Sequence, residues 1–133
     1  MLAGITAAAV WAAAEPSLGR AFRTSYSDVR LLGGLTGTGA RGALALHLVN
    51  GAVFGALFER VGGRGPLRGM LAAQAENLAL WPGMLLAQRV HPACTSGEWP
   101  PLFADRRILA YEVAAHGLFG AVLGLLLPQP PAE

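Results

Sequence analysis

The most constraining feature of this sequence is the apolar segment from Ile108 to Leu127, ILAYEVAAHGLFGAVLGLLL. Two arginines precede it, a proline follows it, and within it only Glu112 and His116 can carry a charge near neutral pH. At about 1.5 Å per residue, a helix of this length covers roughly the 30 Å hydrocarbon core of a bilayer. The segment is therefore predicted to be a transmembrane helix.

Polar and small residues follow two neighbouring stripes of this predicted helix. Glu112 and His116 are four residues apart, so a helix places them on one face. Gly117, Gly120 and Gly124 form a groove beside that face. The polar stripe has to be shielded from lipid, and the glycine groove lets a helix approach closely. The rest of the chain is expected to supply that helix.

Composition agrees with a membrane protein of one domain. The 133 residues are 53% hydrophobic and 14% charged, whereas globular proteins average about 25% charged residues. All ten basic residues are arginines, and because most lie singly between apolar runs, they form no basic patch for nucleic acid. Cys94 is the only cysteine, which excludes an internal disulfide. We predict a single transmembrane domain over residues 1–133.

Three further apolar segments complete the predicted bundle. The first has no basic residue before its apolar run, so we expect a retained helix rather than a signal peptide. It has to continue through Glu15 and Pro16 to reach spanning length. The prediction is an all-α, polytopic integral membrane four-helix bundle with spans at about residues 2–22, 42–59, 66–89 and 107–127.

The second and third segments carry their own polar and small residues. In the second, His47, Asn50 and Gly51 share one helical face, and Gly51 with Gly55 makes a GxxxG packing motif. In the third, Glu76 and Asn77 lie near mid-membrane, one to two turns before Pro82. Proline removes a backbone hydrogen bond, so we expect a kink there.

The connections are predicted to be irregular. Residues 24–41 contain glycine and threonine pairs and no sustained periodicity, which favours a water-exposed loop. Residues 89–107 carry Trp99 and Phe103 around two prolines, a pattern typical of an anchor at the membrane interface. The tail after Leu127 is expected to be disordered.

Two segments of the chain resemble each other. VFGALF at residues 53–58 and LFGAVL at residues 118–123 are 65 residues apart, and each follows a histidine, His47 or His116. This spacing is consistent with two helix pairs related by an axis along the membrane normal. We therefore include a two-helix internal repeat as one interpretation of the fold.

The order of the polar and glycine motifs also resembles a known group of proteins. It is similar to that of small bacterial inner-membrane proteins of unknown function with four transmembrane helices. The resemblance covers about two-thirds of the chain and implies a location in the bacterial inner membrane, but no activity. It rests on His47, Gly51 and Gly55, then Glu76, Trp81 and Pro82, then His116, Gly117 and Gly120.

The arginines predict an orientation. The first and third loops, which lie on one side of a four-span protein, hold seven arginines with their flanking residues, and the middle loop holds three. The positive-inside rule then places both termini outside.

The buried polar residues allow three readings. An ionised acid at a helix centre costs about 2.5–3.5 kcal/mol on insertion scales, so these groups have to be paired, protonated or solvated. The first reading, which we favour, is a non-enzymatic structural or interaction bundle that binds no cofactor and has the lipid bilayer and a second copy of the chain as partners. Its polar network is predicted to contain Glu15, His47, Asn50, Glu76, Asn77, Glu112 and His116.

The other two readings assign chemistry to the same groups. Glu76, Glu112 and His116, with Glu15, could relay protons or cations in a small transporter or channel. Alternatively, His47 and His116 could be axial ligands of a haem, or could join two glutamates around a metal ion. The sequence has no ExxH or HExxH spacing to support that third reading.

Overall fold

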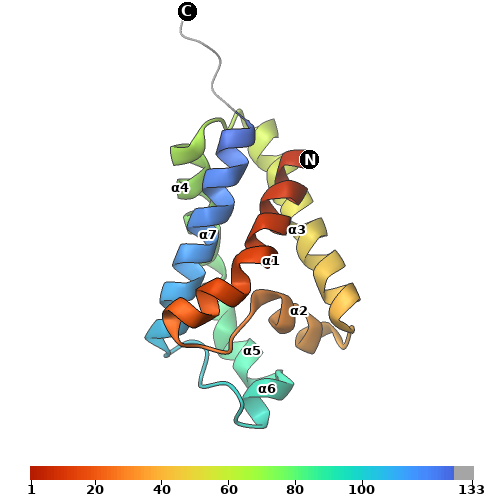
Figure 1. Ribbon diagram of the computed structural model, residues 1–133, viewed down its shortest axis with the longest axis vertical. Coiled ribbons are helices and arrows are strands. Elements are labelled where there is room, and N and C mark those ends of the chain that lie inside the picture. Colours follow the sequence, from red (N-terminus) through yellow and green to blue (C-terminus); the bar gives the residue numbers. More distant parts are fainter. Residues whose placement is uncertain (128–133) are drawn as a thin grey trace, which may run out of the picture.

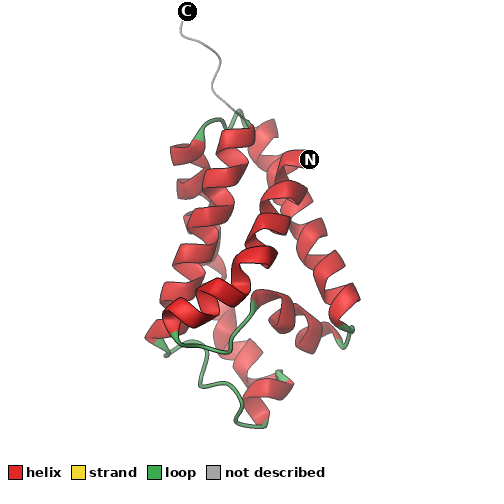
Figure 2. Cartoon of the chain, in the orientation of Figure 1, coloured by secondary structure: helices red, strands yellow, loops and turns green. Residues whose placement is uncertain are grey.

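The computed structural model describes residues 1–127, and that part of the chain consists of helices joined by loops and turns, without a strand (Figure 2). The prediction of an all-α protein is confirmed. The tail predicted to be disordered, residues 128–133, lies outside the described residues. The elements are α1 (Leu2–Phe22), α2 (Asp28–Thr36), α3 (Ala40–Arg60), α4 (Pro66–Leu80), the 3-10 turn η1 (Trp81–Gly83), α5 (Met84–Val90), α6 (Pro92–Thr95) and α7 (Arg106–Leu126).

The long helices α1, α3, α4 and α7 run along the length of the molecule, and α2, α5 and α6 gather at one end (Figure 1). Helix α7 packs against both α1 and α4, while α3 packs against the other side of α1 and against α2. At the end that contains the N-terminus, a hydrogen bond joins the connection between α3 and α4 to the end of α7. The Gly65 N–H donates to the carbonyl of Leu127 over 2.9 Å.

The predicted helix bounds agree with the structure to within two residues, except in the third segment. There η1 interrupts the helix between α4 and α5. Pro82 lies inside this turn, and it has no N–H to continue the α-helical hydrogen bonds. The predicted kink is confirmed.

The prediction of an irregular, water-exposed first loop is wrong. Helix α2 occupies the middle of it, with the Ser27 hydroxyl accepting a hydrogen bond from the Arg30 N–H over 3.1 Å. Gly37 ends the helix in the left-handed conformation at φ 68°. Tyr26 and Leu31 are buried, so α2 is a packed part of the fold.

The prediction that Trp99 anchors the chain at an interface is also wrong. Trp99 is buried, stacks on His91 with ring centroids 4.5 Å apart, and donates its indole N–H to the carbonyl of Ser25 over 3.3 Å. It therefore joins the last connection to the first. Phe103 is exposed.

Glycines set the closest helix contacts. A Cβ added to Gly55 would lie 2.7 Å from the Cα of Gly4 on α1, which is closer than packed atoms allow. A Cβ on Gly120 would likewise lie 2.6 Å from the Cα of Met70 on α4. Gly51 and Gly124 are equally close to α1 and to the start of α4, whereas a Cβ on Gly117 would make only an ordinary van der Waals contact, with Gln74. These glycines pack within the chain, so they no longer support self-association, which stays a prediction.

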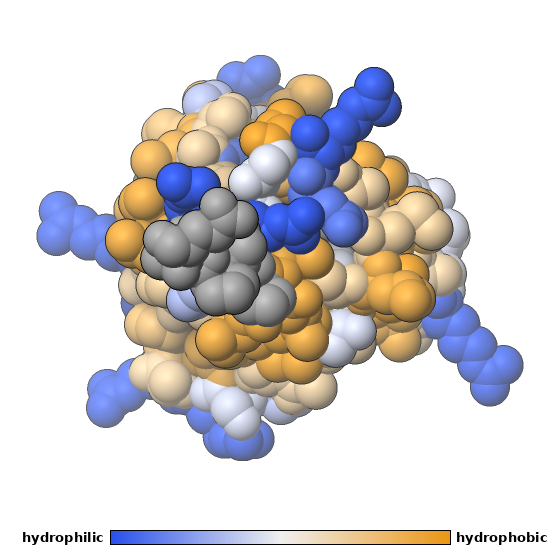
Figure 3. Space-filling view, turned by 90° about the horizontal axis from the view of Figure 1, so that it is seen from above, coloured by the Kyte–Doolittle hydropathy of each residue, from blue (hydrophilic) through white to orange (hydrophobic). Residues whose placement is uncertain are grey.

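Polar side chains lie in a largely apolar interior, and large apolar side chains lie on the surface. Buried positions include six polar or charged side chains, those of Glu15, His47, Asn77, His91, Glu112 and His116. Large apolar side chains lie outside, and Figure 3 shows hydrophobic residues over much of the molecule seen from above. Those more than half exposed on the long helices include Val49, Val53, Leu57, Leu71, Leu78 and Leu125.

Among residues 1–127, two helices are long and apolar enough to cross a membrane. They are α3 and α7, by length and composition. Helix α4 ends after 15 residues at the proline turn. Helix α1 contains Glu15, Pro16 and Arg20. The structure thus supports two candidate spans.

Candidate functional site

Glu112 on α7 is the acceptor of the first polar network. The Tyr26 hydroxyl donates to its Oε1 over 2.5 Å, and Nδ1 of His116 lies 3.2 Å from its Oε2. The same Nδ1 is 2.8 Å from the backbone carbonyl of Glu112, so it faces only acceptors and carries the proton. Burial, reinforced by the nearby carboxylates of Glu112 and Asp28, raises the pKa of Tyr26, which therefore stays a donor.

Glu15 on α1 organises the second network. Its Oε1 accepts the backbone N–H groups of Asp28 over 2.7 Å and Val29 over 3.2 Å, and its Oε2 accepts the Ser27 hydroxyl over 2.5 Å. These N–H groups belong to the first turn of α2 and have no partner inside that helix. A carboxylate at this position also complements the positive end of the helix dipole. Glu15 thereby fixes α2 to α1.

His47 on α3 joins the second network from the opposite side. Its Nδ1 lies 3.0 Å from Oδ2 of Asp28, and its Nε2 lies 3.1 Å from the carbonyl of Ala8. Both partners are acceptors. Nε2 therefore carries a proton toward the carbonyl of Ala8, and a second proton lies between Nδ1 and the Asp28 carboxylate. One side chain thus ties together α1, α2 and α3.

The other predicted site residues do not enter these networks. Glu76 is half-buried and makes no side-chain hydrogen bond or ion pair within residues 1–127. Asn77 is buried and donates to Gln74 over 3.4 Å, while Asn50 is exposed. The predicted cluster is therefore two separate networks plus three residues with few or no partners.

A cavity of about 350 Å³ brings most of the predicted residues together. It lies among α1, α2, α3, α4, α5 and α7, with mainly apolar walls. His47 and Glu15 do not line it. Its polar lining residues are Asp28, Asn50, Glu76, Asn77, Glu112 and His116.

Trp11 on α1 also lines the cavity and packs against His47 and His116. Its ring centroid is 5.0 Å from that of His47 and 4.7 Å from that of His116. The side chain is buried, and its indole N–H has no hydrogen-bond partner in the described part of the chain. Because buried polar groups are normally paired, this donor requires an explanation.

The donor set does not fit the haem or metal reading. Both ring nitrogens of His47 are already committed to Asp28 and to a backbone carbonyl. Within residues 1–127, His, Cys, Asp and Glu side chains form no group of three that could hold a metal ion. His47 and His116 also each pack against the indole of Trp11.

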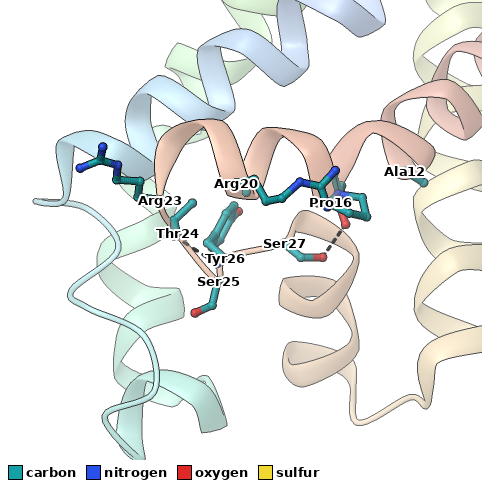
Figure 4. Close-up of a pocket in the computed structure, with 10 residues that line it drawn as sticks. Ala12, Pro16, Arg20, Arg23, Thr24, Ser25, Tyr26 and Ser27 are labelled. Atoms are coloured by element: carbon teal, nitrogen blue, oxygen red, sulfur yellow. Dashed lines mark hydrogen bonds between the residues drawn. The ribbon is translucent and has the colours of Figure 1, made fainter.

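A second hollow, of about 500 Å³, lies on the outside of the α1–α2 connection. Figure 4 shows Ala12, Pro16 and Arg20 on α1 facing the segment from Thr24 to Ser27, with the Ser27 hydrogen bond to Glu15 dashed. Arg20 donates to the Ser17 hydroxyl over 3.0 Å. This hollow exposes the junction of α1 and α2 rather than a cluster of unpaired groups.

The sequence analysis missed Tyr26 and Asp28 as site residues. Both lie in the segment that was predicted to be a loop. The signal was the capping pair of Ser27 and Gly37, which is typical of the start and the end of a short helix. A helix there would have directed attention to the groups beside its first turn.

In comparisons with known proteins, the chain matches no family model, no curated protein and no solved structure. Its function is therefore inferred from the geometry of the cavity and of the surface.

Proposed function

We propose that this chain is an integral membrane protein of the bacterial inner membrane, with four membrane-embedded segments formed by α1, α3, the run α4–η1–α5, and α7. The observation that carries the proposal is the set of leucines and valines exposed along the long helices, together with the acids and histidines buried between those helices. Apolar area gains about 25 cal/mol per Å² on leaving water, so this surface is unfavourable in water and favourable in lipid.

The two helices that do not qualify as spans by themselves are compatible with this proposal. The run from Pro66 to Val90 exceeds the roughly 20 residues that a span needs, because η1 and α5 continue α4 past the proline. In α1, Glu15 accepts three hydrogen bonds, which lowers the cost of placing a carboxylate near the membrane.

The positions of the charged side chains agree with segments that cross the membrane between the two ends of the molecule. Glu59, Arg60 and Arg64 lie at the end of the molecule that holds the N-terminus, next to the turn between α3 and α4. Most of the remaining arginines lie near the opposite end, with α2, α6 and the start of α7. Between the two ends, Glu76 and Glu112 face the cavity.

Within this assignment, the first role of the polar networks is structural. Hydrogen bonds accepted by Glu15 and Glu112, and those made by the ring of His47, join α1, α2 and α3 to one another and the connection after α1 to α7. In lipid, no water competes for these groups, so the partners they have in the fold determine how the helices are arranged. We propose a structural or interaction bundle as the basic function, with the bilayer as its partner.

Membrane fractionation tests the assignment. After an alkaline carbonate wash, we expect the protein to remain in the membrane pellet and to be released by detergent. A protein that enters the carbonate supernatant, or that stays monodisperse without detergent, contradicts the proposal.

One observation favours proton or cation transport as a second function. Among the described residues, Glu76 has no hydrogen-bond or ion-pair partner, and it shares the cavity with Glu112 and His116. Carboxylates in such surroundings mark ion paths in membrane proteins. In proteoliposomes, a proton or cation flux that is lost in Glu76→Gln and retained in Glu98→Gln supports this function. Absence of flux in the wild-type protein contradicts it.

We also propose the two-helix internal repeat. Gly4 and Gly69 are 65 residues apart, and each is the residue of the first helix of a pair on which glycines of the second helix pack. Gly55 and Gly120, also 65 residues apart, are among those glycines. The packing of α1 on α3 therefore parallels that of α4 on α7.

A further inference from the structure

We propose that the cavity among α1, α2, α3, α4, α5 and α7 binds a small organic monocation, an ammonium group on an apolar body, with Glu76 as its counter-ion. The proposal goes beyond the membrane assignment. It needs neither transport nor a membrane for its test, because binding is measured on the purified chain.

The size and walls of the cavity suit a small organic molecule. Its volume of about 350 Å³ lies in the range of ligand pockets, which are mostly apolar with a few polar groups. Leu31, Leu80, Trp81 and Met84 supply apolar walls from α2, from α4 and from the proline turn and α5 that follow it. Neither a hydrated metal ion nor a proton would pack against these apolar walls, whereas an organic ligand would.

The charge of the lining selects a cation. Asp28, Glu76 and Glu112 line the cavity, and the lining contains no arginine. Asp28 is paired with His47, and Glu112 accepts hydrogen bonds from Tyr26 and His116. Glu76 alone has no partner within residues 1–127. One carboxylate without a counter-charge is matched by one monovalent cation, since a desolvated charge is costly until it is paired.

Trp11 provides a second, independent observation. Its side chain is only 6% exposed, it lines the cavity, and its indole N–H has no partner in the described chain. The indole face attracts a cation through its quadrupole. The indole at the wall of the cavity and the carboxylate of Glu76 together favour an ammonium compound.

The charge requirement can be tested with three compounds that share one skeleton. They are 2-amino-1-phenylethanol, which is a cation at pH 7, neutral 1-phenyl-1,2-ethanediol, and anionic mandelate. Binding to the full chain in an uncharged maltoside detergent is measured by isothermal titration calorimetry, with empty micelles as the blank. We expect the cation to bind at least tenfold more tightly than the diol, and mandelate to bind no better than the diol.

Variants of Glu76 assign the counter-ion. We expect Glu76→Gln to weaken binding of the cation at least tenfold and to leave the diol unchanged, whereas Glu76→Asp keeps the preference for the cation. The control is Glu98→Gln, an exposed acid outside this cavity, which should bind as the wild-type protein does. A melting curve checks that each variant is folded.

Three results overturn the proposal. They are equal affinities for the cation and the diol, no detectable binding of the cation at millimolar concentration, and wild-type affinity in a folded Glu76→Gln. If Glu76→Gln does not fold, the comparison of the three compounds on the wild-type protein still decides. Binding of the cation without flux in proteoliposomes retains this inference and contradicts the transport function, and neither result depends on the carbonate wash.

Discussion

Tyr26 and Tyr111 are both buried, but within residues 1–127 only Tyr26 has a hydrogen-bond partner for its hydroxyl. Tyr26 donates to Glu112, whereas the Tyr111 hydroxyl lies near Glu15 without hydrogen-bond geometry. We predict that Tyr26→Phe lowers the free energy of unfolding by about 1–3 kcal/mol, because it leaves a buried carboxylate short of a donor. Tyr111→Phe should change it by less than about 0.5 kcal/mol. Unfolding in mixed micelles measures both, and equal losses would contradict the assigned network.

Asp105 caps the N-terminus of α7, and its charge gives stability that depends on pH. The Arg107 side chain and the N–H groups of Arg107 and Ile108 lower the pKa of this carboxyl. A lowered pKa in the folded state stabilises the protein above the ordinary value of about 3.9 and ceases to do so as the pH falls through the folded value.

Asp105→Asn tests this pH dependence, because asparagine keeps the capping oxygen but does not titrate. We predict that the wild-type protein is more stable than the variant by about 0.3–1 kcal/mol at pH 7, a small effect because solvent screens the ion pair. The difference should shrink as the pH falls below the ordinary value of about 3.9 and disappear once the pH is below the lowered folded pKa. A difference that is independent of pH in thermal melts would rule out a contribution from the charge.

At the scale of helices, two glycines of α7 make opposite predictions. A Cβ on Gly120 would overlap the backbone of α4, whereas a Cβ on Gly117 would come no closer than 3.7 Å to Nε2 of Gln74. We predict that Gly120→Ala costs more than about 2 kcal/mol, since the two backbones have to separate. Gly117→Ala should be neutral or stabilising by up to about 1 kcal/mol, because alanine favours the helix.

The same unfolding assay in mixed micelles compares these two variants. If Gly117→Ala is the more damaging of the two, the packing of α7 on α4 is wrong. Helix contacts of this kind were only partly predictable. The GxxxG spacing in α3 indicated a packing face, but a glycine pattern does not say which helix will cover it.

For the whole molecule, the arrangement of the helices predicts which exposed positions share a side of the membrane. Thr38 and Ser96 lie at the end that holds α2 and α6, and Val61 lies at the end that holds the N-terminus. In a Cys94→Ser background, Thr38→Cys and Ser96→Cys should react from the cytoplasmic side with a thiol reagent that does not cross membranes. Val61→Cys should react from the outside, as the positive-inside rule predicts.

Labelling of all three cysteines from one side would contradict the four membrane-embedded segments. The reverse pattern, with Val61→Cys inside, would keep the segments and contradict only the predicted orientation. Labelling of all three in detergent is the control for accessibility, since each of these side chains is exposed.

Local features of the sequence were sufficient for most of the helices. Apolar length placed α1, α3 and α7 within two residues of their ends, and Pro82 marked the break after α4 because its ring removes a backbone donor. Helix α2 was not predicted, because the glycines and threonines in and around it are typical of a loop. The backbone N–H groups of its first turn donate to Glu15, which lies on another helix.

The candidate site depended on tertiary structure to a larger extent. The sequence by itself determined that acids and histidines lie on otherwise apolar helices and so have to face inward, because desolvated charge is costly. Only the fold decided which of them meet. It paired Glu112 with Tyr26 and His47 with Asp28, and it placed Glu76 at the cavity without a partner from the part of the chain that the structure describes. Such pairings depend on the rotation and depth of each helix, which long-range packing fixes and local periodicity does not.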